Sequence, residues 1–340
     1  MKAVLSLHPM TKLWFPAILI LFFSCDHHRS TCIEAPELSE SHVKIQLTRL
    51  EDDLFHSTSP RDVLHFLNRH SVIKKEFFGS DQYPSDTILA RELYKRISNP
   101  YTDSLYHETL AYFGSMDLLK EQFQSAFDYI SYYYPSFNPP KIETLISGFA
   151  SSEMYVSDSL IVIGLEFYLG PTAKYRPVGI PGYILKRYEQ SYIVPACILL
   201  LSNKFLKQSP KDNTMLADMV YYGKKYYFAK HMMPCTPDSL LIWYDSDELQ
   251  NVEKNKELLW YHFLEHQLLY ETNYEIKQKY MDERPHVFEI GDKCPGRIGS
   301  WIGWDIVRQY MSKNSSVTLQ QLMNNPNARN ILTKSDYRGK

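Results

Sequence analysis

The amino end of the 340-residue sequence lacks an apolar run long enough to stay in a membrane. Its apolar stretch, residues 13–23, has about half of the roughly 20 residues that a helix needs to cross the hydrocarbon core. This stretch is therefore expected to serve as an export signal and not as a permanent transmembrane anchor.

The sequence also lacks the short signatures of several enzyme and cofactor classes. It contains no H-E-x-x-H, no G-x-S-x-G and no G-x-x-x-x-G-K-[ST], which are typical of metalloproteases, esterases and nucleotide-phosphate sites. Without a C-x-x-C, neither a zinc ribbon nor a thioredoxin-like redox motif is supported. Glycosidase carboxylate pairs leave no local spacing, so that class stays open.

Positive charge is not in excess. The chain has 37 Lys and Arg against 39 Asp and Glu, for a formal net charge of −2. No broad basic field is available to hold a polyanion, so nucleic acid is not an expected partner. Hydrophobic residues make up 44%, with 26 Tyr and 17 Phe, and this composition is typical of a globular protein and not of a disordered one.

What is present at the amino end is the pattern of a bacterial lipoprotein signal peptide. A flank with two lysines precedes the apolar residues 13–23, and the small Ser24 precedes Cys25. Two or three acyl chains on this cysteine would anchor stably, because each buried methylene contributes about 0.8 kcal/mol. We predict a signal peptide over residues 1–24 and lipidation at Cys25; the alternative is an ordinary secretory signal in which Cys25 is incidental.

The predicted mature chain has a polar start and one large body. Residues 25–41 are poorly patterned and are predicted to form a lipidated flexible tether, followed by a single globular domain over 42–340. Four cysteines remain after lipidation and can pair in three ways in an oxidising envelope: Cys32, Cys197, Cys235 and Cys294. Spacing selects none of these pairings, and we expect Cys32, in the tether, to be a free or incidental thiol.

Periodicity predicts a mixture of helices and a few strands in the body. Alternation at Val43, Ile45 and Leu47 indicates a first strand. Residues 142–169 are rich in β-branched and aromatic side chains, with a turn at 157–159 that favours a hairpin. The expected fold class is α+β and helix-dominated, with one small antiparallel sheet near the middle.

Four helices stand out by their spacing. The first is expected to be capped by Ser115 and to end before Pro135. The core faces of the four are predicted to carry, in chain order, Leu119, Phe123, Phe127 and Ile130; Leu216, Met219, Val220, Gly223 and Tyr227; Leu258, Leu259, Phe263 and Tyr270; and Ile302, Ile306 and Tyr310.

Residues 262–266 (HFLEH) fit H-x-x-E-H, the inverted zincin motif in which two histidines hold zinc and a glutamate activates water. One helical turn separates His262 from His266, so both would share a face. A short match needs structural context, and no downstream acid stands out as a third ligand. We expect ordinary helix residues, no metal and no cofactor; the alternative is a zinc-dependent hydrolase using His262, Glu265 and His266.

Two further segments are expected to be structural. Glu166 lies in an apolar, strand-like run and is expected to be a buried, hydrogen-bonded group and not a catalyst. Residues 221–227 (YYGKKYY) interleave aromatics with lysines, but helical spacing predicts a packed helix from which Lys224 and Lys225 extend outward.

Residues 295–304 (PGRIGSWIGW) are the stretch richest in Gly and Trp. Gly299 and Gly303, four residues apart, would let another element approach the helix backbone closely. Arg297 is a candidate to hold an acidic partner bidentately. Trp301 and Trp304 are expected either to contribute to a partner surface or to fill the core.

Short stretches along nearly the whole mature chain occur together in one order. After the lipoprotein-type start they are residues 49–55 (RLEDDLF), 163–170 (IGLEFYLG), 193–195 (IVP), 222–224 (YGK) before Pro234, 295–304, and 306–311 (IVRQYM). Each is weak alone, but the ordered set resembles the GldB family of gliding-motility lipoproteins.

The resemblance implies a role and a localisation. It implies a lipoprotein of the cell envelope, at the outer membrane and facing the periplasm, that supports gliding motility or the linked secretion machinery. The implied partners are the membrane, through acyl chains, and other envelope motility or secretion proteins. No enzyme is implied. The family is also distantly similar to predicted zinc proteases, and the equivalent residues 219–225 (MVYYGKK) carry neither His nor Glu, which implies a zincin-like scaffold without metal.

Overall fold

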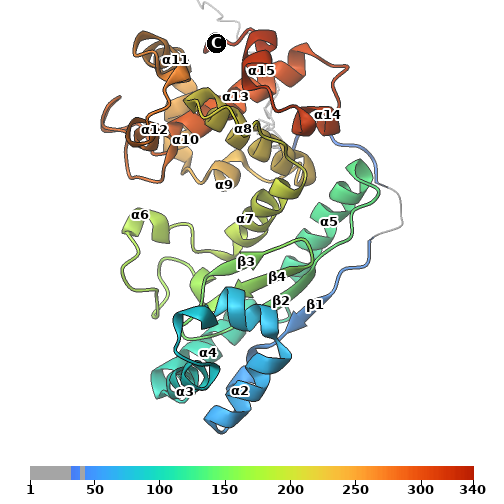
Figure 1. Cartoon of the computed structure of the whole chain (residues 1–340), viewed down its shortest axis with the longest axis vertical. Coiled ribbons are helices and arrows are strands. Elements are labelled where there is room, and N and C mark those ends of the chain that lie inside the picture. The colour runs from blue at the N-terminus through green and yellow to red at the C-terminus, as the bar shows by residue number, and fades with distance from the viewer. Residues whose placement is uncertain (1–31, 39–42) are drawn as a thin grey trace, which may run out of the picture. The chain divides into compact units, whose positions relative to one another are not determined.

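A four-stranded sheet lies between two groups of helices in the computed structural model (Figure 1), which describes residues 32–38 and 43–340. The strands in spatial order are β1 (Leu47–Arg49), β2 (Lys141–Leu145), β4 (Leu160–Gly164) and β3 (Met154–Val156). The predicted signal peptide, Cys25 and much of the predicted tether lie outside the described residues.

The sheet is mixed, and not antiparallel as predicted. β1 pairs with β2, and β2 with β4, in parallel, whereas β3 runs antiparallel to β4. The β3–β4 hairpin is confirmed, and the Ser157 N–H donates to the Leu160 carbonyl across its turn at 2.8 Å. Parallel partners are joined by crossovers that are distant in sequence. Such pairs leave no turn signal, so the sequence indicated the hairpin alone.

Helices make up most of the rest, and the predicted helix-dominated α+β class is confirmed. The helical elements before β2 are α1 (Glu51–Phe55), α2 (Pro60–Arg69), η1 (Ile73–Phe77), η2 (Ser80–Gln82), α3 (Asp86–Ile97), α4 (Pro100–Phe113) and α5 (Asp117–Tyr133). Those after β4 are η3 (Leu165–Tyr168), α6 (Gly182–Leu185), α7 (Gln190–Leu201), η4 (Ser202–Lys204), α8 (Met215–Met232), α9 (Asp238–Ile242), α10 (Ser246–Lys254), α11 (Lys256–Glu265), η5 (Leu268–Tyr270), α12 (Tyr274–Met281), α13 (Ile298–Lys313), α14 (Leu319–Asn324) and α15 (Ala328–Ser335). None of these helices is both long and apolar enough to span a membrane. The zincin-like part of the fold prediction stays a prediction.

Strand β4 is buried on both faces. Ile161 and Ile163 join the large core built with α4, α5, α7, α8 and α13, whereas Val162 joins a smaller core built with α1 to α3 and η1. Successive side chains of a strand point to opposite faces, so one apolar run can serve both cores. A strand covered on both sides is continuously apolar and not alternating, as residues 160–164 (LIVIG) are.

The predicted core faces of the helices are largely confirmed, with corrections at the helix ends. All four predicted core residues of α5 are buried. Ser115 is not its cap, because α5 begins at Asp117 after Met116, whose φ of +61° lies in the left-handed region. The Ser115 hydroxyl donates instead to the Asp117 carboxylate at 2.5 Å. The first strand is also shorter than expected and begins at Leu47.

In the segment 258–270, two predicted core residues are exposed. Leu258 is 68% and Tyr270 52% exposed, whereas Leu259 and Phe263 are buried as predicted. Helix α11 ends at Glu265, and the left-handed residue that follows, Gln267 (φ +54°), redirects the chain before Tyr270. One helical period therefore does not extend over the whole segment.

Helices α8 and α13 pack backbone against backbone at two glycines. A Cβ on Gly303 would lie 1.8 Å from the Met219 carbonyl oxygen, and a Cβ on Gly223 would lie 2.2 Å from the Gly303 carbonyl oxygen. The predicted close approach at Gly299 and Gly303 is confirmed, since a Cβ on Gly299 would also meet the Met281 Sδ at 2.4 Å. This crossing holds α8 in the centre of the large core.

Candidate functional site

A cavity of about 530 Å³ lies beside α7 and α8, within the size range of small-molecule sites. Its aromatic lining residues are Tyr168, Tyr188, Tyr192, Tyr222, Tyr226 and Trp243, and its charged lining residues are Glu153, Arg187, Lys225, Asp282, Glu283 and Arg297. Aliphatic side chains and two methionines complete the wall. The cavity is thus mostly apolar, with a few charged groups.

Two helices supply opposite kinds of lining through helical spacing. Tyr192, Ala196 and Leu199 of α7 are four and three residues apart, so they share one face. Tyr222, Lys225 and Tyr226 of α8 share a face for the same reason. The wall from α7 is therefore largely apolar, whereas α8 contributes one amine between two phenol rings.

Two arginines share one carboxylate in the cavity wall. Arg187 Nη1 lies 2.6 Å and Arg297 Nε lies 3.0 Å from the same oxygen, Glu283 Oε2. Arg297 also donates from Nη2 to the Ile242 carbonyl at 2.6 Å. The predicted acidic partner of Arg297 is therefore found, but the contact uses one oxygen and is not bidentate.

An indole packs beside both guanidinium groups. The Trp243 ring centroid lies 5.0 Å from the Arg297 Cζ and 6.0 Å from the Arg187 Cζ, within the range of cation–π attraction. Trp243 Nε1 and Glu283 Oε1 are buried atoms without a hydrogen-bond partner among the described residues. Arg297 Nε, although it forms an ion pair with Glu283 Oε2, also has no hydrogen-bond partner there, so the wall presents two donors and one acceptor without hydrogen bonds.

Lys225 is the most unusual group in the cavity. Its side chain is buried, at 9% exposure, and the described residues offer its ammonium only the rings of Tyr221 and Tyr222, with centroids 5.4 and 5.8 Å away. Burial lowers the pKa of Lys225 to about 8, because desolvation disfavours the charged form. Among the described residues, no carboxylate forms an ion pair with this buried amine.

Its neighbour Lys224 is buried in a different way. Lys224 Nζ donates to the carbonyls of Lys207, Met323 and Asn325, at 2.8, 3.3 and 2.9 Å. Burial lowers its pKa to about 8 as well, but all three ammonium hydrogens have acceptors. The prediction that Lys224 and Lys225 extend outward is wrong, because most of the circumference of α8 is covered and both lysines are buried.

The structure places the three residues of the H-x-x-E-H match near the surface. The rings of His262 and His266 stack 4.2 Å apart, and His262 Nε2 lies 3.2 Å from the Tyr280 hydroxyl. Glu265 is exposed. Burial, and then the nearby His266, lower the pKa of His262. Within the described part of the chain, no cluster of three or more His, Cys, Asp or Glu side chains is placed to hold a metal ion.

Glu166 is buried, as expected, at the end of β4. Its Oε1 accepts from the Ser147 N–H and hydroxyl, both at 2.7 Å, and from the Phe149 N–H at 3.3 Å. Its Oε2 has no partner among the described residues. Burial raises the pKa of this carboxyl. Its hydrogen bonds hold the loop after β2 and do not reach the cavity.

The two tryptophans of the Gly- and Trp-rich stretch lie in the core. Trp301 and Trp304 are each 1% exposed, and the Trp304 ring packs 5.2 Å from the Tyr226 ring. The core alternative is therefore the one observed, and neither side chain is available to a partner. Arg297 alone of the three predicted residues lines the cavity.

Arg187, Trp243 and Glu283 line the cavity without having been predicted from the sequence, and Lys225 lies inside the protein and not on its surface as predicted. Those three residues come from separate loops, so no local spacing connects them. A signal for Lys225 was present, because α8 carries apolar or aromatic residues around its whole circumference. A helix that is apolar on all sides is buried, and its lysines are then buried with it.

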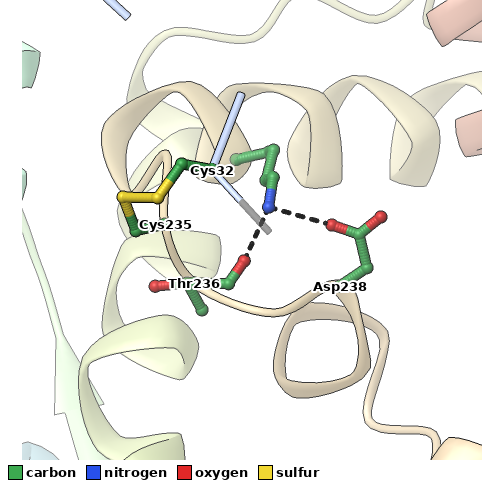
Figure 2. Close-up of a disulfide and its surroundings, with 5 residues drawn as sticks. Cys32, Cys235, Thr236 and Asp238 are labelled. Carbon is green, nitrogen blue, oxygen red and sulfur yellow. Dashed lines mark hydrogen bonds and ion pairs between the residues drawn. A yellow bond between two sulfur atoms is a disulfide. The ribbon is translucent and has the colours of Figure 1, made fainter. Parts of the chain in front are cut away.

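Cys32 is bonded to Cys235, so the expectation of a free Cys32 thiol is wrong (Figure 2). The bond joins residues 203 positions apart, and the Ile33 N–H also donates to the Pro234 carbonyl at 3.1 Å. Figure 2 shows that Cys235 lies just before Thr236 and Asp238 at the start of α9. Cys197 and Cys294 are buried free thiols. Sequence separation of this size gives no clue to a pairing.

Comparison with known proteins identifies a family. A family model described as gliding motility protein GldB matches residues 31–339. Neither the curated proteins nor the solved structures yielded a match. The matched range covers the sheet, both groups of helices and every residue that lines the cavity.

Proposed function

The chain belongs to the gliding motility protein GldB family, and from this premise we propose that it acts as a lipid-anchored envelope protein in motility. It supports gliding, or the protein secretion linked to it, by assembling with other envelope proteins and not by catalysis. Its proposed place is the outer membrane, facing the periplasm. The family match over residues 31–339 is the observation that carries this proposal.

The disulfide supports an exported location. Disulfides persist in oxidising compartments such as the bacterial periplasm and are rare in the cytosol. A bond between Cys32 and Cys235 therefore fits a body that folds outside the cytoplasm.

This bond also limits how far the body lies from its proposed anchor. Seven residues lead from Cys25 to Cys32, and a fully extended chain covers at most about 3.5 Å per residue, or roughly 25 Å. In the proposed lipoprotein, Cys25 is therefore separated from the Cys32–Cys235 bond by only a short stretch of chain. The tether of the proposed lipoprotein is short, and not a long flexible linker.

Cysteine labelling tests the exported, lipidated state. Protein isolated from the envelope is unfolded and alkylated before and after reduction. We expect Cys197 and Cys294 to react without reduction and Cys32 and Cys235 only after it, while Cys25 stays blocked and carries a palmitate analogue. Reaction of Cys32 without reduction, or label uptake by a Cys25→Ala protein, would contradict the proposal.

Deletion of the gene tests the role itself. We expect reduced cell spreading or reduced protein secretion, restored by the wild-type gene and not by Cys25→Ala. His262→Ala and Glu265→Ala genes address the hydrolase alternative, and both are expected to restore function fully. Loss of rescue by either, with normal protein levels, would favour catalysis over assembly.

A further inference from the structure

The charged groups of the cavity do not balance. Lys225 and Arg297 are buried, and Arg187 is nearly so, with a side chain that is 14% exposed. In the part of the chain that the structure describes, Glu283 is the one carboxylate that pairs with this group, and its two ion pairs both go to the arginines. The other two lining acids, Glu153 and Asp282, are exposed. The enclosed part of the wall therefore has two cations in excess.

Lys225 is the sharpest sign of a missing partner. Buried charges are normally paired and hydrogen-bonded, because an isolated ion in an apolar surrounding loses its hydration without compensation. Lys224, the next residue, follows that rule with three carbonyl acceptors. Lys225 lines the cavity and has no acceptor among the described residues. Its ammonium therefore faces the space of the cavity, and the buried Trp243 Nε1–H in the same wall also has no acceptor among the described residues.

The rest of the lining specifies the body of a ligand. Tyr192, Ala196, Leu199 and Leu200 from α7 and Tyr222 and Tyr226 from α8 form walls that pack against apolar surface. Sites of this kind bind through apolar contact, and a few polar groups fix the orientation. A ligand that fits must combine an apolar body with one negatively charged head.

We propose that this cavity is a binding site for a small amphipathic carboxylate, whose head lies at Lys225 and whose apolar body lies between α7 and α8. Arg187 and Arg297 are held by Glu283 and stabilise the negative head from a distance. Glu283 Oε1 is left to accept from a donor on the ligand. The site requires neither the membrane anchor nor the motility role, so its failure would leave the proposed function untouched.

Binding is measured by isothermal titration calorimetry on the purified mature protein with three ten-carbon probes. Decanoate carries the carboxylate, decanol lacks the charge, and decyltrimethylammonium reverses it. We expect saturable binding of one decanoate per chain, weaker binding of decanol and none of the cation. Absence of saturable decanoate binding, or tighter binding of the cation, would overturn the proposal.

Substitution of Lys225 assigns the head group position. Lys225→Met keeps the length of the side chain and removes the charge, and we expect the decanoate Kd to rise about tenfold or more, because a charge-assisted hydrogen bond contributes about 1.5–3 kcal/mol. Decanol binding should stay unchanged. Lys225→Arg should retain decanoate binding, and the exposed Lys254→Met outside the cavity is the matched control. Equal decanoate affinity in Lys225→Met and wild type would remove Lys225 from the site.

A second variant tests where the apolar part of the ligand binds and leaves every charged residue in place. Ala196→Phe fills space between α7 and α8, and we expect it to abolish binding of both decanoate and decanol. Circular dichroism and a cooperative thermal transition establish that each variant is folded. Undiminished binding in a folded Ala196→Phe protein would place the probes outside this cavity and contradict the proposal.

Discussion

The two sides of α8 accommodate a buried lysine in opposite ways. On the side toward α13 and α14, backbones meet at Gly223 and Gly303, and the ammonium of Lys224 is enclosed by three carbonyls. On the cavity side, Lys225 is buried beside two phenol rings, and no residue that the structure describes offers its ammonium an acceptor. The first side is satisfied by the chain itself, whereas the second is completed only by a ligand. One helix thus carries a structural lysine next to a functional one.

The largest expected effect on stability comes from disrupting the contact between α8 and α13. Gly303→Ala places a methyl group 1.8 Å from the Met219 carbonyl oxygen, so α8 and α13 must separate. We expect a loss of about 4 kcal/mol in the free energy of unfolding, at the upper end for overpacking. Denaturant unfolding measures it. Gly182→Ala in α6, where nothing lies within 4 Å, is the control, and an equal loss there would contradict the assigned cause.

The next largest effect concerns Lys224, whose ammonium is fully hydrogen-bonded. Lys224→Met leaves the carbonyls of Lys207, Met323 and Asn325 without their donor. Buried acceptors that lose a partner cost about 1–3 kcal/mol, so we expect a loss of about 3 kcal/mol in unfolding free energy. Lys254→Met, on the exposed side of α10, should change little. A stable Lys224→Met protein would mean that these carbonyls do not depend on the amine.

Substitution of the next residue, Lys225, should change the free energy of unfolding in the opposite direction. Lys225→Met removes a buried charge that has no ion-pair or hydrogen-bond partner among the described residues, and replacing buried ionic groups by apolar side chains of similar volume is often neutral or stabilising. We expect the free energy of unfolding at pH 7 to rise by about 1–3 kcal/mol, measured in the same denaturant series. A clear loss of stability would show that Lys225 has a partner within the chain.

The smallest expected effect is a pH dependence of the stability difference between Lys225→Met and wild type. The pKa of Lys225 falls from its usual 10.5 to about 8 on folding, so between these values the unfolded chain binds more protons than the folded one. Stability from this group therefore rises with pH across that window. The advantage of Lys225→Met over wild type should be full below pH 8 and should shrink toward pH 10.5. A constant difference across this range would contradict the assigned titration.

Prediction from sequence succeeded where the signal was local. The β3–β4 hairpin follows from the turn at 157–159, and the buried face of α5 follows from one helical period. The glycine crossing of α13 was also visible, because Gly299 and Gly303 lie one turn apart.

The features that were not predicted depend on contacts between residues distant in sequence. The parallel pairs of β1, β2 and β4, the bond from Cys32 to Cys235 and the sharing of Glu283 by Arg187 and Arg297 all join separate segments. The outward assignment of Lys225 failed for the same reason: one helix considered alone does not show what covers it.

The pKa of the Lys225 ammonium, followed by NMR on protein labelled at lysine side chains, tests the central claim most directly. Without ligand the account predicts a pKa of about 8. With saturating decanoate we expect the pKa of Lys225 to rise by about one unit or more, because a carboxylate within about 4–6 Å favours the charged form of an amine. A pKa that does not respond to decanoate, or one near 10.5 in the free protein, would contradict it.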